Sequence, residues 1–64
     1  MLDFGKSLRV AQQVKGISSA ELSRMLGVHR QQINIWRSKK NCRLDTAIRV
    51  CDALGYGLEE FLKL

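Results

Sequence analysis

The fold is decided by residues 18–37, which read SSAELSRMLGVHRQQINIWR. This stretch opens with a capping box, because the hydroxyl of Ser18 and the carboxylate of Glu21 can satisfy each other's free backbone amides at the start of a helix. We therefore expect a helix over residues 18–26. Gly27 ends it, since glycine enters the left-handed conformation without strain.

A second helical pattern follows almost at once. It is expected over residues 29–37, with His29 at its N-cap position and with Ile33 and Trp36 facing inward at helical spacing. The joint between the two helices is Leu26-Gly27-Val28. Short helices joined by such a turn cross steeply, so the sequence predicts a helix-turn-helix.

Three further helices are expected outside this pair. One runs over residues 3–15, capped by Asp3 and ended by Gly16, and the others cover residues 44–54 and 58–63. The chain is thus predicted to be a single all-α domain of five helices over its whole length. The side chains expected to face inward in the five helices are Phe4, Leu8, Ala11 and Val14; Leu22, Met25 and Leu26; Ile33 and Trp36; Leu44, Ala47, Ile48, Cys51 and Leu54; and Phe61, Leu62 and Leu64.

Length and composition exclude several classes of protein. The chain has 64 residues, of which 45% are hydrophobic and 27% charged, with no proline. This is a globular composition with room for one core. No uninterrupted apolar run approaches the roughly 18 residues of a membrane span. Two cysteines cannot build the disulfide framework of a small secreted domain, so we expect a cytoplasmic protein.

The net charge of +5 is concentrated in one part of the chain. No acidic residue lies between Glu21 and Asp45, whereas the remainder carries five basic and six acidic residues. Such segregation points to an anionic partner, with nucleic acid first and a membrane surface second. The basic residues between those two positions are Arg24, Arg30, Arg37, Lys39, Lys40 and Arg43.

The outward face of the helix over residues 29–37 carries side chains of the types that read base edges. Arginine grips guanine, glutamine or asparagine grips adenine, and an apolar group touches the thymine methyl. Neither Glu nor Asp, which would repel phosphates, is present there. Taken alone, these residues are either base-reading or ordinary solvated polar side chains. They are His29, Arg30, Gln31, Asn34 and Ile35.

At this point the chain resembles the Cro/C1-type (XRE) helix-turn-helix family of phage repressors and small bacterial regulators. The resemblance covers residues 4–64 and implies a compact five-helix, lambda-repressor-like domain that binds operator DNA, usually as a symmetric dimer. The segments that carry it are Phe4-Gly5-x-x-Leu8-Arg9, Gly16-Ile17-Ser18, Glu21-Leu22, Leu26-Gly27-Val28, Ile33-x-x-Trp36 and Ala53-Leu54-Gly55.

The resemblance also implies roles for individual residues. Arg30, Gln31 and Ile35 match the base-reading positions of the family, with Gln32 and Asn34 beside them. Arg43 matches a position that faces the minor groove in some members. The loop from residue 38 to residue 43 either contacts the DNA backbone or is an ordinary charged loop. The residues expected at phosphates or the backbone are Ser18, Ser19, His29, Arg37, Ser38, Lys39, Lys40, Asn41 and Arg43.

One pair of positions departs from the family pattern. Many members have Arg where this chain has Gln12 and Glu where it has Arg37. Because both charges have changed together, two alternatives follow. Either a hydrogen bond between Gln12 and Arg37 replaces the ion pair, or Arg37 is free to reach a phosphate.

Catalysis and metal binding are not expected. His29 stands alone, without a paired carboxylate or nucleophile, and the six acidic residues are scattered or lie at helix starts. Cys51 lies on an inward stripe, and Cys42 is expected to be an exposed free thiol. Zinc would need four ligands at suitable spacing, which these residues do not offer. We expect no cofactor.

The last segment of the chain is unusually apolar for a surface. Two interpretations remain open: the segment closes the core beneath the first helix, or it forms a dimer contact. The residues concerned are Tyr56, Leu58, Leu62 and Leu64.

The sequence therefore predicts a transcriptional regulator that binds specific double-stranded DNA. We expect a Cro-like repressor whose two copies present their third helices to successive major grooves of a near-palindromic operator, about 34 Å apart. No sensing domain is evident, so no small-molecule effector is expected. The alternative is a DNA-binding antitoxin or another protein-interaction module of a two-component operon.

Overall fold

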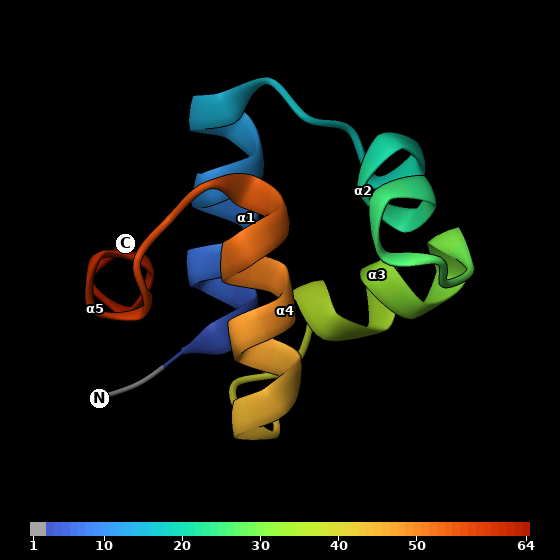
Figure 1. The fold of residues 1–64 in the computed structure, drawn as a ribbon. Helices are drawn as coiled ribbons and strands as arrows, with labels where there is room; N and C mark the ends of the chain where they lie inside the picture. The colour runs from blue at the N-terminus through green and yellow to red at the C-terminus, as the bar shows by residue number, and fades with distance from the viewer. Residues whose placement is uncertain (1–2) are drawn as a thin grey trace.

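Five helices and no strand make up residues 3–64, the part of the chain that a computed structural model describes (Figure 1). The all-α, five-helix class expected from the sequence is confirmed. The helices are α1 (Phe4–Lys15), α2 (Ser19–Leu26), α3 (Arg30–Arg37), α4 (Leu44–Leu54) and α5 (Leu58–Leu62).

Local capping explains where α2 begins and how the chain turns into α3. The Ser18 hydroxyl accepts a hydrogen bond from the Glu21 backbone N–H at 3.1 Å, and the Glu21 carboxylate accepts one from the Ser18 backbone N–H at 3.4 Å. Together they form the expected capping box. At the other end, Gly27 adopts φ 69°, a left-handed conformation in which other residues are strained. The chain thereby reverses within three residues and starts α3 from His29.

The core lies where α1 meets α3, α4 and α5. Phe4 is fully buried at its centre, with ring centroids 5.8 Å from Phe61 and 6.5 Å from Trp36. The contact with Trp36 is edge-to-face, a favoured aromatic geometry. The ring of Trp36 is half-buried and packs against this core, so its expected inward position holds.

The helix-turn-helix is joined to the rest of the domain by α4 as well as by α1. Arg49 on α4 donates a hydrogen bond from Nη2 to the carbonyl oxygen of Leu26 at 2.9 Å. This bond satisfies one of the carbonyls left free at the C-terminal end of α2. Helix α2 also packs directly against α3 and α4. The pair α2–α3 is therefore held at a fixed angle to α1 and α4.

Four apolar residues expected to face inward are exposed instead. The exposed fraction is 66% for Val14, 51% for Met25, 66% for Leu44 and 44% for Ile48. Val14 and Met25 lie in the last turns of short helices, and Leu44 begins α4. Ile48 lies about 100° around the helix axis from the buried Ala47, since successive residues are spaced at 3.6 per turn.

The buried face of α4 is rotated away from the expected stripe. Val50, which was not predicted to be inward, is fully buried together with Cys51 and Leu54. Cys42 is another correction: it is half-buried and packs against the core, whereas an exposed thiol was expected. The loop is bonded through the Lys40 carbonyl oxygen to the N–H of the buried Phe4, which holds Cys42 close to the core, and Cys42 and Trp36 line the same hollow.

The C-terminal apolar residues all contribute to closing the core. Tyr56 is half-buried, with its ring 6.5 Å from that of Phe61 and with Lys15 Nζ 4.7 Å from its centroid. This packing agrees with the first of the two interpretations of the segment, and contact with a second copy stays a prediction. Tyr56, Leu58, Leu62 and Leu64 are partly buried and pack against the core. No helix in the described part of the chain has the length and apolarity needed to cross a membrane.

Candidate nucleic-acid interface

Helix α3 presents a polar, carboxylate-free face to solvent. Arg30, Gln31 and Asn34 are exposed, and Ile35 keeps 47% of its surface accessible. Gln32 is half-buried, so of the five residues expected to read bases it is the least available. The opposite side of α3 holds the fully buried Ile33, which fixes the rotation of the helix. The face thus combines hydrogen-bonding and apolar groups on one side of a helix.

The start of α3 adds two features to this face. His29 occupies the N-cap position and is exposed, with no hydrogen bond from its side chain to the helix. Beside it, the turn and α3 enclose a shallow hollow of about 440 Å³ that includes Val28 and Ile35. Two apolar side chains next to polar ones suit a base edge that carries a methyl group.

The loop between α3 and α4 is anchored to the start of α1. The backbone N–H of Phe4 donates to the carbonyl oxygen of Lys40 at 2.9 Å, and that of Gly5 donates to Lys39 at 2.7 Å. These amides have no partner within α1, so the loop satisfies them. Gly5 is required for this approach, since a Cβ there would lie 2.6 Å from the Lys39 carbonyl oxygen.

Anchoring of the main chain leaves the basic side chains of the loop exposed. The Ser38 hydroxyl donates to the Ile35 carbonyl oxygen at 2.8 Å and closes α3. Arg43 holds the N-cap position of α4 without a capping hydrogen bond from its side chain. The exposed residues of the loop are Ser38, Lys39, Lys40, Asn41 and Arg43.

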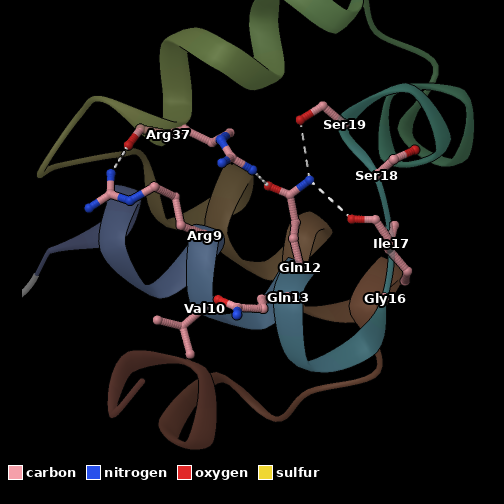
Figure 2. A pocket seen from close by; sticks show the side chains of 9 residues that line it. All are labelled: Arg9, Val10, Gln12, Gln13, Gly16, Ile17, Ser18, Ser19 and Arg37. Atoms are coloured by element: carbon pink, nitrogen blue, oxygen red, sulfur yellow. Dashed lines mark hydrogen bonds between the residues drawn. The ribbon is translucent and has the colours of Figure 1, made fainter.

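The two serines at the start of α2 differ in their surroundings. Ser18 is exposed, and its hydroxyl also donates to Glu21 Oε1 at 3.3 Å. Ser19 is half-buried, and its hydroxyl oxygen accepts a hydrogen bond from Gln12 Nε2 at 3.3 Å. Both serines line a hollow that is also lined by Arg37, the last residue of α3 (Figure 2).

Arg37 is hydrogen-bonded to Gln12, as the first of the two alternatives expects, and its contact with a phosphate stays a prediction. Arg37 Nη1 donates to Gln12 Oε1 at 2.6 Å (Figure 2). The ion pair common in similar proteins is therefore replaced by a hydrogen bond between a cation and a neutral amide. Arg37 stays half-buried in this position.

The sequence patterns predicted no contact for two residues of this region, Arg9 and Gly5. Arg9 Nη1 donates to the Arg37 carbonyl oxygen at the C-terminal end of α3 (Figure 2). Gly5 permits the close approach of the loop, as described above. Gly5 and Arg9 belong to a segment that carries the family resemblance, and an isolated glycine inside a helical pattern often marks a close backbone contact, but neither observation gave these residues a role. No pattern in the residues near Arg9 predicted a hydrogen bond to a residue 28 positions away.

The titratable groups of the described residues form no metal-binding cluster and include no cysteine with a lowered pKa. No cluster of three or more His, Cys, Asp or Glu side chains within residues 3–64 is arranged to hold a metal ion. Burial and the nearby carboxylate of Asp45 raise the pKa of the Cys42 thiol. Burial, followed by Asp52 and Cys42, raises the pKa of the Cys51 thiol. Both thiols are therefore protonated near neutral pH and are weak nucleophiles.

Comparison with known proteins agrees with this geometry. The family model of the Cro/C1-type HTH DNA-binding domain matches residues 7–64. The match includes α2, α3 and the basic loop. No curated protein matches the chain significantly.

Proposed function

The chain belongs to the Cro/C1-type helix-turn-helix DNA-binding family and is a DNA-binding regulator; from this premise we propose that it is a Cro-like repressor of a specific operator. In this proposal α3 enters the major groove and reads base edges. Occupation of the operator then blocks access of the polymerase. The protein acts in the cytoplasm, where its DNA is, and needs no cofactor or small-molecule effector.

One observation carries the proposal: the exposed face of α3 bears base-reading side chains and no carboxylate. Arg30 can grip guanine O6 and N7 with both guanidinium nitrogens, and Gln31 can pair with adenine N6 and N7. Ile35, with the hollow beside Val28, suits the thymine methyl. Asn34 lies one turn after Arg30 and adds a second amide, while the half-buried Gln32 has a supporting role.

Contacts to the DNA backbone are proposed on both sides of α3. Such contacts fix the orientation of the protein on the duplex and supply most of the affinity that does not depend on sequence. The anchored loop after α3 carries exposed lysines and an arginine, and the start of α2 carries two hydroxyls. The proposed residues are Ser18, Ser19, His29, Arg37, Ser38, Lys39, Lys40, Asn41 and Arg43.

We further propose that two copies bind one near-palindromic operator. The longest dimension of the domain is 27 Å, less than the roughly 34 Å between successive major grooves on one face of DNA. One copy therefore covers one half-site. The accessible edges of Tyr56, Leu58, Leu62 and Leu64 are the proposed contact between copies, in addition to their role in the core.

The decisive experiment is selection of bound sequences from a random duplex library. We expect enrichment of a two-fold symmetric motif whose half-sites lie about one helical turn apart. A comparison variant is Gln31→Ala/Ile35→Ala, which should retain DNA at low salt and enrich a motif with relaxed preference at the base pairs that these two side chains read. Salt-sensitive retention of DNA by the wild type without any enriched motif would contradict sequence-specific regulation. The search would then turn to a protein partner.

A further inference from the structure

A single buried amide links the three helices that surround the candidate backbone contacts. Only 4% of the Gln12 surface is exposed. Its Oε1 accepts from Arg37 on α3, and its Nε2 donates to the Ile17 carbonyl oxygen and to Ser19 Oγ on α2, each at 3.3 Å (Figure 2). All these bonds use one side-chain amide. Gln12 on α1 thus sets the position of α3's last residue relative to the start of α2.

Arg37 is held at both its side chain and its backbone. The guanidinium bonds to Gln12 at 2.6 Å, and the carbonyl oxygen accepts from Arg9. A guanidinium that is fixed in advance loses less conformational entropy when it binds an anion. Because Gln12 is neutral, this positioning leaves the positive charge of Arg37 intact.

The hollow beside Arg37 is open, and none of the described residues that line it carries a carboxylate. Beside the Gln12–Arg37 pair lies a solvent-accessible hollow of about 610 Å³, lined by Arg9 and Arg37, by Ser18 and Ser19, and otherwise by neutral residues (Figure 2). The carboxylate at this end of α2 belongs to Glu21, which caps Ser18 and does not line the hollow. Two guanidinium groups and the Ser19 hydroxyl favour a phosphate there, whereas the Ser18 hydroxyl donates to Glu21.

We propose that Gln12 is a positioning residue that presents the uncompensated charge of Arg37 to a DNA phosphate at this hollow. An acidic residue at position 12 would hold Arg37 equally well but would neutralise it. Because the Gln12 amide is neutral, Arg37 makes one additional phosphate contact. This contact raises the affinity for any duplex, whatever its sequence. This inference rests on the proposed DNA-binding function and deepens it.

The test is the substitution Gln12→Glu, which keeps the shape of the side chain and adds a negative charge. Lys63→Gln is the control: Lys63 is exposed, follows α5 away from this hollow, and its loss gives the same change in net charge. The dissociation constant is measured between 50 and 200 mM salt for a random-sequence duplex, together with thermal unfolding. We expect Gln12→Glu to remain folded and to lower the slope of log K against log salt by about 0.9, the loss of one contact.

At 50 mM salt we expect Gln12→Glu to bind about three- to tenfold more weakly, with Lys63→Gln close to the wild type. Equal slopes for the two variants would overturn the inference while leaving the function intact, provided that the wild type binds duplex DNA. Absence of DNA binding by the wild type would overturn both. If Gln12→Glu does not fold, Arg37→Gln replaces it, because two amides can still pair. An unchanged slope in that variant would also overturn the inference.

Discussion

Arg30 and Gln31 are the residues on which sequence recognition is expected to depend most. Both are exposed at the start of α3, whose rotation is fixed by the buried Ile33. Arg30→Ala removes a side chain that can make two hydrogen bonds to one guanine. We expect a loss of about 1–3 kcal/mol on the selected operator and relaxed preference at one base pair. Competition binding with a set of single-base operator variants measures both effects.

The matched control for Arg30→Ala is Arg24→Ala. Arg24 is an exposed arginine of α2, so its loss changes the net charge equally without touching the face of α3. We expect it to leave the order of preference among operator variants unchanged. If Arg30→Ala preserves the ratio of operator to random-sequence affinity, the base-reading role assigned to Arg30 is wrong.

Cys51 makes a different prediction at the residue scale, about stability and pH. Burial raises the pKa of its thiol above the ordinary value of 9.0, so the folded state disfavours the thiolate. The resulting stabilisation is complete below the pKa of the unfolded chain and is lost as the pH rises through the higher pKa of the folded chain. We expect the free energy of unfolding to fall more steeply between pH 8 and 10 in the wild type than in Cys51→Ala. Urea unfolding across this range measures it, and parallel pH profiles would contradict the prediction.

At the scale of elements, the loop between α3 and α4 depends on a glycine in α1. A Cβ at Gly5 would lie 2.6 Å from the Lys39 carbonyl oxygen and would also overlap the carbonyl of Arg37. Because the obstructing atoms are backbone, the loop must move. We expect Gly5→Ala to lower the free energy of unfolding by about 1–3 kcal/mol and to weaken DNA binding. Chemical denaturation and DNA titration measure the two effects.

Gly57→Ala provides the control for Gly5→Ala. At Gly57 a Cβ meets only the flexible end of Glu60, at 3.3 Å, and the backbone has φ −73°. A loss of less than about 1 kcal/mol is expected there, the size of a weakened cap. Equal losses in the two variants would mean that the contact between α1 and the loop contributes little.

The difference between these elements also shows what the sequence can predict. The capping box at Ser18 and the turn at Gly27 arise from residues within a few positions of each other, so their patterns identified the helix-turn-helix. Burial of Val50, and exposure of Ile48, depend instead on the direction from which other helices approach α4. Periodicity marks an amphipathic helix well but locates the centre of its buried face only to within about one residue.

The residues of the candidate interface also differ in how far the sequence alone predicts them. Residue types alone indicated Arg30 and Gln31, because the chemistry of base edges is local to each side chain. The Gln12–Arg37 bond was one of two alternatives, and its choice needed the packing of α1 against α3. The Arg9 bond to α3 joins residues 28 positions apart, beyond any local pattern.

The loop as an element is expected to act on DNA through charge alone. Lys40 is exposed, while its carbonyl oxygen is bonded to the Phe4 N–H, so the side chain can be removed without loosening the backbone. We expect Lys40→Ala to weaken binding to all sequences similarly and to lower the salt slope by about 0.9. Lys63→Ala, which removes an exposed lysine at the other end of the fold, should leave the slope unchanged. A change of base preference in Lys40→Ala would contradict this assignment.

At the scale of the whole molecule, size limits how much DNA one copy can cover. The domain measures 27 × 19 × 19 Å. DNA rises about 3.4 Å per base pair, so the longest dimension corresponds to about eight base pairs. A single copy therefore spans one half-site, and the helical phase between half-sites decides whether two copies can touch. The proposed contact between copies would make binding to the two half-sites cooperative.

Insertion of five base pairs between the half-sites of the selected operator tests this arrangement. Five base pairs are about half a helical turn, so the second half-site moves to the opposite face of the duplex. Two domains no longer than 27 Å then cannot meet across the DNA without deforming it. We expect cooperativity to vanish and each half-site to bind with the affinity of an isolated one, as measured by footprinting titrations. Changing the spacer sequence at constant length is the control and should preserve cooperativity. Cooperative binding that survives the insertion would contradict direct contact between copies, because only a contact is sensitive to which face of the duplex each copy occupies.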